Sequence, residues 1–552
     1  MRQVNAAIPR GFSDTLFKEA ARREQLSACL GEHFAAAGYE LVETPNVEYL
    51  ETLQRAMMTP ESRGSELFRF VDVDGRLLAL RNDVTIALAR VVASRFTLLP
   101  PPWRLRYRAD VFREQESLRG NERQVTQLGI ECFGLPRETG DLEILQLALG
   151  SLRATGLRST VLHLSDVGVI RALLDDVADQ TPWYEAFSAA WHSGDHIGAR
   201  ELAEDGTLAP ERATAIVWLL TARGGAEVLS RARELLGDCE AAQRALSNVR
   251  RNFEATVAAG FEGEVLVDFS LLPVFNYYSG LVFELYARLT DGTGLVLGSG
   301  GRYDTLMEQF GRCLPAAGFV YDLSRLERAV ADAECSAAPA RRPLRIAVPK
   351  GKLFDDCIAL LSRAGVTVAG MEAPGRSLRL ANDDYELIIA KPSDVAIYVS
   401  RGAADVGVGG RDILVEADFP LLQLADLRFG GCEFVVAVPQ DCTMTLDELS
   451  LQLGTVRVAT KYPRLTQRFF DGRGIQVEIV KLNGNIELGP LIGIADVIVD
   501  ITQTGATLRE NKLRVLERVL PSTARFVANA VAARTDPRVA ALTARLQELV
   551  CS

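Results

Sequence analysis

Residues 333–343, which read AECSAAPARRP, separate two halves of the chain whose secondary-structure patterns differ. The segment is rich in alanine and proline and has no apolar periodicity, which is typical of a linker between domains. Directly after it, LRIAVPKGK predicts a buried strand followed by a turn. We therefore predict two folded parts, 1–334 and 343–552, joined by a linker at 335–342.

The first part contains groups of strands separated by a long helical stretch. A helix is predicted over 13–36 with Asp14 as its N-cap, and residues 170–260 are rich in Ala, Leu, Arg and Glu. Strands are predicted at 66–72, 76–81, 104–113, 126–133, 265–269 and 277–287. Helices between separated groups of strands predict an α+β domain with a helical insertion at about 170–260.

The second part has short apolar strands that alternate with helical segments. The strands are predicted at 346–349, 386–390, 406–409, 432–439, 455–460, 477–482 and 495–501. Continuous apolar strands of this kind predict an α/β domain whose parallel sheets are covered by helices on both faces.

Composition excludes several classes of function. The net charge of −11 argues against a broad nucleic-acid surface, although a local basic pocket for a phosphorylated small molecule is compatible with it. No uncharged apolar run reaches ~18 residues, and the N-terminus lacks the apolar region of a signal peptide, so we predict no membrane association. Nine cysteines without a C-x-x-C pair predict free thiols in a reducing cytoplasm. No histidine follows His196, which excludes imidazole chemistry from the second part.

The sharpest chemical motif is DITQTGATL at 500–508, which follows the apolar strand ADVIV and precedes LRENKLRVLERVL, a segment predicted to be helical. Gly505 lets backbone amides turn toward an anion, Thr504 and Thr507 add hydroxyl donors, and a helix N-terminus adds partial positive charge. Asp500 could hold a pair of sugar hydroxyls or orient a metal ion. The motif predicts a phosphate cradle, with a simple threonine-capped helix as the alternative.

Three further segments near strand ends carry cations that suit a polyanion. They are the PKGK turn with Lys350, Gly351 and Lys352, the GRSLRL segment with Arg376, and the AKPSD segment with Lys391. Ordinary solvated surface cations are the alternative interpretation. The glycines of GVGG at 407–410 could in addition bring the backbone close to a ligand.

Several motifs of the second part occur in the order known from one enzyme family. They are IAVPKGKL, RSL, KPSDVAIYVSRGAADVGVGGRDILVE, VATKYPRLT, LNGNIELGPLIGIADVIVDITQTGATLRENKL and ARFVANA. Nearly all of 343–552 resembles the short-form catalytic subunit of ATP phosphoribosyltransferase. The resemblance implies two α/β lobes of the periplasmic-binding-protein type with the active site between them. It also implies the first step of histidine biosynthesis, in which N1 of ATP attacks the anomeric carbon of phosphoribosyl pyrophosphate and pyrophosphate leaves.

The resemblance also implies roles for individual residues. Residues 500–508, with Asp500, Thr504, Gly505, Ala506 and Thr507, would bind the 5′-phosphate and ribose. Glu487 would position substrate or metal, Mg²⁺ is the implied cofactor, and the phosphates of ATP and pyrophosphate would face Lys350, Lys352, Arg376 and Lys391. The nucleophile is a neutral ring nitrogen, so the chemistry needs positioning and charge stabilisation more than a strong base. The family often has arginine at Lys352 and Lys391, and lysine lacks the bidentate fork.

The first part contains the motifs PRGFSD, GYELVETPNVEYL, LRNDVTIALAR, YRADVFREQESLRGNERQVTQLGIECFG, NYYSGLVFELY, GSGGRYDTL and GFVYDLSRL in that order. Residues 5–330 resemble the class II catalytic core of histidyl-tRNA synthetase. They are similar, more closely, to the synthetase-like regulatory subunit of ATP phosphoribosyltransferase.

Departures from the synthetase pattern favour the regulatory subunit. Pro273 and Val274 occupy the positions of the Arg-Gly pair that assists adenylate formation, and Gln115 replaces a motif glutamate. In the last motif Asp322 replaces a glycine and Ser324 a glutamate, and no anticodon-binding domain follows. The residues that resemble the amino-acid pocket of the synthetase are kept. Carboxylates and amides among them suit the ammonium and imidazole N–H groups of histidine. These residues are Asp83, Thr85, Arg113, Gln127, Glu131, Tyr277 and Tyr278, for which inherited contacts without a ligand are the alternative.

We therefore predict a fused ATP phosphoribosyltransferase whose N-terminal domain activates the enzyme and mediates feedback inhibition by histidine. By resemblance it would be a homo-oligomer, with ATP and phosphoribosyl pyrophosphate as substrates. One alternative is a histidyl-tRNA synthetase paralogue, which histidine-dependent ATP–pyrophosphate exchange would reveal. The other is a non-enzymatic ligand-binding protein, since the two-lobed fold also serves solute receptors.

Overall fold

The computed structural model describes residues 7–56, 67–114, 122–271, 277–334, 342–503 and 505–551. The chain divides into two compact units, one of Met1–Ser188 with Ala199–Arg341 and one of Ala189–Gly198 with Arg342–Ser552. Most of the predicted linker, along with Gln115, Pro273, Val274 and Thr504, lies outside the described residues.

Unit 1 is built on a nine-stranded mixed sheet in the order β1-β5-β6-β12-β11-β10-β7-β9-β8. The strands are β1 (Glu40–Leu41), β5 (Trp103–Phe112), β6 (Gln124–Phe133), β12 (Ala316–Asp322), β11 (Gly294–Arg302), β10 (Leu281–Arg288), β7 (Thr160–Asp166), β9 (Val265–Asp268) and β8 (Arg223–Gly224). A smaller antiparallel sheet has the order β2-β4-β3, with β2 (Val47–Tyr49), β4 (Leu77–Leu80) and β3 (Arg69–Val71). The central strands β5, β6, β12, β11 and β10 pair antiparallel, as the predicted α+β class requires.

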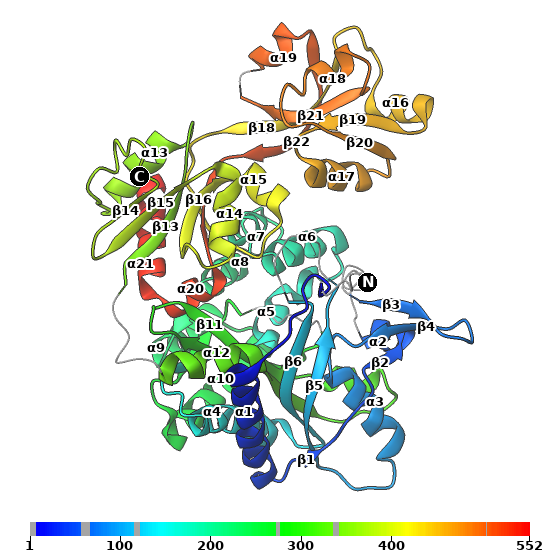
Figure 1. Cartoon of the computed structure of the whole chain (residues 1–552), viewed down its shortest axis with the longest axis vertical. Coiled ribbons are helices and arrows are strands. Elements are labelled where there is room, and N and C mark those ends of the chain that lie inside the picture. Colours follow the sequence, from blue (N-terminus) through cyan, green and yellow to red (C-terminus); the bar gives the residue numbers. More distant parts are fainter. Residues whose placement is uncertain are drawn as a thin grey trace, which may run out of the picture. The chain divides into compact units, whose positions relative to one another are not determined.

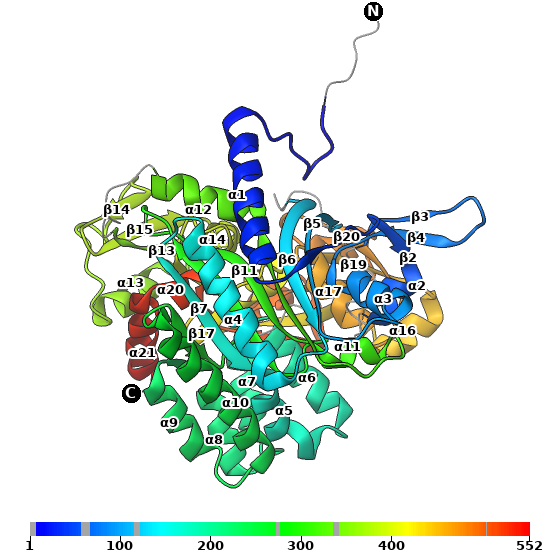
Figure 2. The ribbon, with the colours of Figure 1, turned by 90° about the horizontal axis from the view of Figure 1, so that it is seen from below.

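Helices α1, α4 and α12 pack together against this sheet (Figure 2). The helices outside the insertion are α1 (Phe17–Ala36), α2 (Leu50–Ala56), α3 (Thr85–Arg95), α4 (Arg137–Ala154), α11 (Asp304–Glu308) and α12 (Leu323–Glu334). Helix α1 begins at Phe17 and its N-cap is Leu16, which makes no side-chain cap hydrogen bond, so the prediction that Asp14 caps this helix was wrong. Burial of Leu26, Leu30 and Phe34 against the sheet holds the helix instead.

The helical insertion follows β7. Its helices are α5 (Val167–Leu174), α6 (Thr181–His192), α7 (His196–Ala203), α8 (Pro210–Leu219), α9 (Ala226–Leu235) and α10 (Glu240–Thr256), with a 3₁₀ turn at Asp175–Val177 and a π turn at Val257–Phe261. Helix α10 packs on α5, α9 and strands β7 and β9, which connects the insertion to the main sheet.

Unit 2 has two lobes, each with its own sheet (Figure 1). The N-lobe (344–426 and 524–551) has the order β14-β15-β13-β16-β23-β17, with β14 (Arg379–Ala381), β15 (Tyr385–Ala390), β13 (Leu344–Pro349), β16 (Val406–Gly410), β23 (Ala524–Ala528) and β17 (Leu422–Asp426). The C-lobe (432–522) has the order β20-β19-β21-β18-β22, with β20 (Val477–Lys481), β19 (Val456–Thr460), β21 (Val497–Thr502), β18 (Cys432–Pro439) and β22 (Leu513–Ser522).

Helices cover both faces of each sheet, as predicted. They are α13 (Phe354–Arg363), α14 (Pro392–Ser400), α15 (Arg411–Ala417), α16 (Leu446–Leu453), α17 (Pro463–Asp471), α18 (Leu488–Leu491), α19 (Ala506–Glu510), α20 (Ala530–Thr535) and α21 (Pro537–Cys551). Strand β18 shows the alternation, because Phe434 and Val436 pack in the core with α16 and α17, whereas Val435 and Ala437 pack on the opposite face with α19.

Both sheets of unit 2 are mixed, so the prediction of parallel sheets was only partly right. Strands β13, β15 and β16 are parallel, and so are β19, β20 and β21. Strands β23 and β18 pair antiparallel with their neighbours. The physical reason is that these strands enter each sheet from the other lobe, because the chain crosses between lobes after β17 and again after β22.

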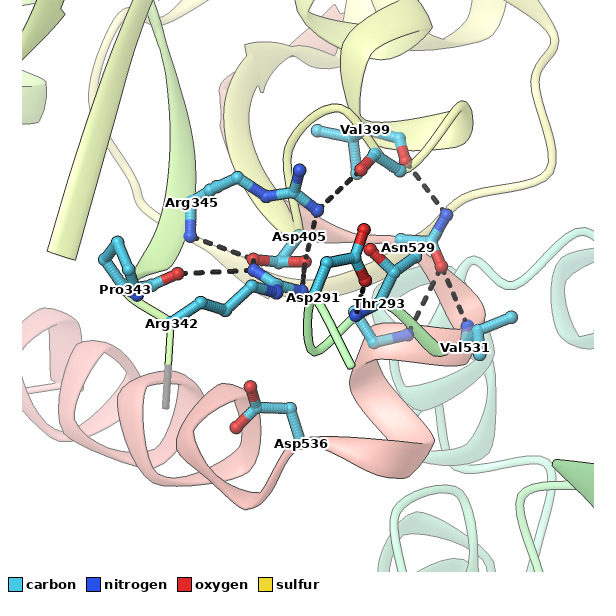
Figure 3. Close-up of polar contacts among 12 residues, drawn as sticks. Asp291, Thr293, Arg342, Pro343, Arg345, Val399, Asp405, Asn529, Val531 and Asp536 are labelled. Carbon is cyan, nitrogen blue, oxygen red and sulfur yellow. Dashed lines mark hydrogen bonds and ion pairs between the residues drawn. The ribbon is translucent and has the colours of Figure 1, made fainter. Parts of the chain in front are cut away.

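A buried carboxylate holds the start of the second unit. Asp405 is 2% exposed and accepts from Arg342 at 2.6 and 2.7 Å and from the backbone N–H of Arg345 at 2.9 Å (Figure 3). Its backbone carbonyl accepts from Asn529, whose side chain caps α20. The bidentate Arg–Asp pair therefore fixes where β13 begins, and β13 leads directly into the PKGK turn.

Candidate active site

The DITQTGATL segment lies where β21 ends in the C-lobe. The half-buried carboxyl of Asp500 accepts from the N–H of Ile501 at 2.8 Å. Burial raises the pKa of Asp500 to about 6, and the negative charge of Glu487 acts in the same direction. Gly505 has a φ of 71°, a left-handed conformation that favours glycine, and its N–H donates to Thr502 Oγ1 at 3.0 Å. Ala506 and Thr507 follow at the exposed start of α19.

The helix predicted over LRENKLRVLERVL is wrong for most of its length. Helix α19 has five residues, and Leu513–Ser522 forms strand β22, which pairs with β18. The apolar residues of LRVLERVL fit a helical period, but Val515 and Val519 are β-branched and pairing with the distant β18 decides the outcome. The Gly505 turn, more than a long helix, therefore defines the shape of the segment.

The N-lobe cations lie at the carboxyl ends of neighbouring strands. Strands β13 and β15 are parallel and pair through Pro349 and Ala390, so Lys350 and Lys391 follow them at the same edge. The backbone N–H of Lys350 donates to the carbonyl of Ala390 at 2.7 Å. Arg376 precedes β14, which pairs antiparallel with β15. All three side chains are exposed, as a polyanion site at this edge requires.

One contact joins the PKGK turn to the C-lobe. Lys352 Nζ hydrogen-bonds Gln503 Oε1, next to the Gly505 turn, and Gly351 before it has a φ of 90°. Glu487 is at the N-cap position of α18 and its charge reaches Asp500. The structure therefore brings Lys352, Glu487, Asp500 and Gly505 to one place, and it connects the two lobes there.

Two residues near Asp500 were missed by sequence reasoning. Lys461 is exposed after β19, and its charge lowers the pKa of both Asp500 and Asp412. Tyr462 is 4% exposed, and the pKa of its hydroxyl is raised by burial and then by the charges of Asp412 and Asp500. The available signal was the TKYP sequence directly after a parallel strand adjacent to β21.

The GVGG glycines pack closely against neighbouring side chains, and their approach to a ligand stays a prediction. All of Val406–Gly410 is buried. A Cβ on Gly407 would lie 2.9 Å from Val395 and Val399, and one on Gly410 would overlap the carboxylate of Asp412. The glycines make room for helix α14 and for Asp412.

In unit 1 the structure brings four of the predicted pocket residues together. Asp83 Oδ2 accepts from Tyr277 Oη at 3.0 Å, and Thr85 Oγ1 donates to Glu131 Oε1 at 2.5 Å. Tyr303 Oη donates to the other oxygen of Glu131. Burial raises the pKa of Asp83, and it raises that of Glu131 to about 8.

The remaining pocket residues lie around this pair of carboxyls. The charge of Arg113 lowers the pKa of Asp83, and the rings of Tyr277 and Tyr278 lie 5.1 Å apart. Gln127 is half-buried on β6, and no contact joins its side chain to the two carboxyls in the described residues. Sequence reasoning missed Tyr303 and also Tyr107, whose charged form would interact with both carboxyls.

An open pocket of about 350 Å³ lies beside these residues and shares Tyr107 with them. Its lining is Val42, Glu43, Thr44, Asn46, Arg81, Tyr107, Arg108, Ala109, Asp110 and Thr126. The buried Arg81 donates to Thr44, Asn46 and the carbonyl of Asp110, so its guanidinium is occupied by the protein itself.

Two further observations concern residues 7–551 apart from the undescribed segments between them. Among the helices there, none combines the length and apolarity that crossing a bilayer requires. In that part of the chain no three His, Cys, Asp or Glu side chains gather as a metal site.

Unit 2 thus combines two α/β lobes, cations at a strand edge of one lobe, and a carboxylate with a glycine turn in the other. This combination is typical of enzymes that bind phosphorylated substrates between two lobes. Unit 1 has a sheet whose central strands pair antiparallel, with two buried carboxyls close to tyrosines, and this sheet is typical of a class II synthetase-like domain.

Comparisons with known proteins identify both parts. The family model for histidyl-tRNA synthetase matches residues 11–326, and that for ATP phosphoribosyltransferase matches 391–548. The ATP phosphoribosyltransferase regulatory subunit of Moorella thermoacetica is 38% identical over 319 residues, which are 58% of this chain and 80% of that protein. The ATP phosphoribosyltransferase of Rubrobacter xylanophilus is 44% identical over 188 residues, 34% of this chain and 87% of that protein.

A solved structure agrees for the first part. The crystal structure of an ATP phosphoribosyltransferase regulatory subunit/histidyl-tRNA synthetase from Bacillus halodurans is 26% identical with a TM-score of 0.55, and the match covers 71% of this chain and 94% of that one. The chain therefore belongs to the ATP phosphoribosyltransferase family and joins its synthetase-like regulatory part and its catalytic part in one polypeptide. It is the enzyme of the first step of histidine biosynthesis, and its N-terminal domain is regulatory. The predicted fold class, family and reaction are confirmed.

Proposed function

We propose that the reaction takes place between the lobes of unit 2, with phosphoribosyl pyrophosphate bound at residues 500–508. The observation that supports this most directly is the half-buried Asp500 next to the left-handed turn at Gly505. The carboxylate accepts the ribose hydroxyls, and the amides after Gly505 with the hydroxyls of Thr504 and Thr507 bind the 5′-phosphate.

The N-lobe cations bind the remaining phosphates. Lys350, Lys391 and Arg376 share one strand edge, and Lys352 reaches the C-lobe at Gln503. Their charges stabilise the leaving pyrophosphate and hold the triphosphate of ATP, so that adenine N1 meets the anomeric carbon.

Magnesium is the metal that best fits the site. The available ligands are the carboxylates of Asp500 and Glu487, which are hard oxygen donors, and Mg²⁺ is commonly held by one or two carboxylates together with substrate phosphates. When bound, the metal ion neutralises charge on the pyrophosphate. Formation of phosphoribosyl-ATP by the purified chain, followed by absorbance with and without Mg²⁺ and histidine, tests the reaction, the metal and the effector together.

Histidine is the proposed effector of the regulatory domain, bound at Asp83, Thr85, Glu131 and Tyr277. Two buried carboxyls close to tyrosines suit its ammonium and imidazole N–H groups. Adenylate chemistry is disfavoured because Asp322, which replaces the synthetase glycine, pairs with Arg325 at 3.1 Å. A histidine-dependent ATP–pyrophosphate exchange by the chain would contradict this.

A homo-oligomer and a cytoplasmic location complete the proposal. Phe70, Val71 and Leu77 are apolar and exposed on the small sheet of unit 1, a surface that suits contact with a second copy. The cysteines with described side chains have free thiols, which fits a reducing compartment. Light scattering of the purified chain gives the oligomeric state.

Replacing Thr504 and Thr507 together with alanine is expected to lower kcat/KM for phosphoribosyl pyrophosphate at least about tenfold, since each hydrogen bond to a charged group contributes about 1.5–3 kcal/mol. Steady-state kinetics with circular dichroism as the folding control measure this. An unchanged kcat/KM would argue against the phosphate cradle.

Residues 342–552, which keep Arg342 as the partner of Asp405, are expected to fold when expressed alone but to show kcat/KM at least about fivefold below that of the full chain, which is the lower range of allosteric coupling. The reason is that the regulatory half activates as well as inhibits. Full activity of the isolated half, measured by the same absorbance assay, would show that residues 1–334 only inhibit.

A further inference from the structure

Helix α15 belongs to the N-lobe but packs on both lobes of unit 2. Leu414 is buried in the N-lobe core with Val395 and Val527. Its neighbours Ile413 and Val415 pack instead against the C-lobe core around Phe434. The helix therefore lies where the two lobes meet, next to α17 of the C-lobe (Figure 1).

The start of α17 lacks a cap from its own sequence. Tyr462 is in the N-cap position and makes no side-chain cap hydrogen bond, and Pro463 follows at the first helical position. The next N–H groups, of Arg464 and Leu465, have no helical partner at this end. They would be unsatisfied without an acceptor from another part of the protein.

Glu416 of α15 supplies that acceptor from the other lobe. Its Oε2 accepts from the N–H of Arg464 and the N–H of Leu465, both at 3.1 Å. The side chain is half-buried, and burial raises its pKa while these two N–H groups lower it. Asp418, just beyond α15, adds ion pairs with Arg464 at 3.1 Å and Arg468 at 2.9 Å.

The capped end of α17 is also the turn that faces the proposed phosphoribosyl site. Lys461 and Tyr462 immediately precede the helix, and both interact electrostatically with Asp500. Tyr462 is fixed by a perpendicular contact with Phe434, at 4.7 Å between ring centroids. The position of this turn relative to the N-lobe therefore depends on the Glu416 cap.

We infer that Glu416 is a positioning residue for the transfer reaction, which acts by fastening the Lys461–Tyr462 turn of the C-lobe to the N-lobe. The inference rests on the proposed function, because it takes Asp500 as part of the phosphoribosyl site. In this role Glu416 need not contact the substrate. It holds the turn that places Lys461 beside Asp500.

The test compares Glu416→Ala with a matched cap in the same lobe as α17. Helix α16 is capped by its own residues, because Thr445 and Glu448 form a capping box. Glu416→Ala removes the acceptor that caps α17, and Glu448→Ala removes the reciprocal half of the α16 capping box, so both are expected to lower thermal stability. Only Glu416→Ala is expected to raise KM for phosphoribosyl pyrophosphate. The rise should be about tenfold, which corresponds to the free energy lost with one strong helix cap. Its KM for ATP should change less than about twofold, which is the split that a positioning role requires.

Two more variants keep the inference falsifiable. Glu416→Gln retains an acceptor oxygen and is expected to keep KM within about threefold of wild type. Asp418→Asn removes the exposed ion pairs with Arg464 and Arg468. Asp418 has a left-handed backbone conformation, which asparagine also adopts, so the fold should be kept. We expect this variant to raise KM for phosphoribosyl pyrophosphate about twofold. This variant provides the answer if Glu416→Ala does not fold.

The outcomes separate this inference from the proposed function. Unchanged KM in Glu416→Ala, or an equal rise in Glu448→Ala, would overturn the positioning role while Asp500→Asn still loses activity. Wild-type kinetics in Asp500→Asn would overturn the proposed site itself and this inference with it.

Discussion

Asp500→Asn is expected to lower kcat/KM for phosphoribosyl pyrophosphate by at least about a hundredfold. A carboxylate that accepts two sugar hydroxyls makes two charge-assisted hydrogen bonds, each worth about 1.5–3 kcal/mol, and asparagine loses the charge. Steady-state kinetics in both substrates measure the loss. Asp496→Asn is the matched control, because Asp496 pairs with Arg457 at 2.6 Å directly before the same strand and should leave kcat/KM unchanged.

The pH dependence of the wild-type enzyme supplies an independent check on Asp500. Its pKa of about 6 means that the carboxyl becomes protonated as the pH falls through that value. A protonated carboxyl accepts hydroxyls poorly, so kcat/KM should fall on the acid side of about pH 6, and this dependence should be absent from Asp500→Asn. An asparagine variant within about threefold of wild type, or with the same acid limb, would contradict the assignment.

Glu131→Gln is expected to weaken inhibition by histidine at least about tenfold and to leave activity without histidine near wild type. The pKa of about 8 means that Glu131 is largely protonated at neutral pH in the free pocket, and glutamine is the closest neutral replacement. The fold should therefore survive. Bound histidine requires the anion as a partner, so loss of that charged hydrogen bond costs about 1.5–3 kcal/mol of binding.

Histidine titrations of the activity of the variant and of the wild type measure this effect. Glu264→Gln is a suitable control, since Glu264 pairs with Arg153 at 2.5 Å in an exposed position of the same unit. If Glu131→Gln is inhibited at the wild-type histidine concentration, the effector binds elsewhere.

Several features followed from local sequence alone. The buried strands of unit 2 were placed within a few residues, because runs such as CEFVVAVP and ADVIVDI are apolar on both faces and have turn residues at their ends. The left-handed turn at Gly505 could also be predicted from local sequence, because glycine adopts positive φ more readily than other residues. The reaction was predicted from the resemblance of the sequence motifs to those of ATP phosphoribosyltransferase.

Other features depended on partners far away in the chain. LRVLERVL fits a helix by its period, and it becomes β22 only because β18 offers a free edge about eighty residues earlier. Glu131 accepts hydrogen bonds from Tyr303, which is 172 residues away in the sequence, and from Thr85, which is 46 residues away. No local sequence pattern encodes either pairing.

The sequence by itself determined the two domain types, the chemistry of the site motifs and most strand positions, because these depend on residue type and short-range periodicity. Only the tertiary structure decided that the sheets are mixed, that Lys461 and Tyr462 belong beside Asp500, and that Glu416 caps a helix in the other lobe. The physical reason is that hydrogen bonds and charges act over a few ångströms in space. Which residues come within that distance is set by how the chain crosses between lobes and by the packing of their cores.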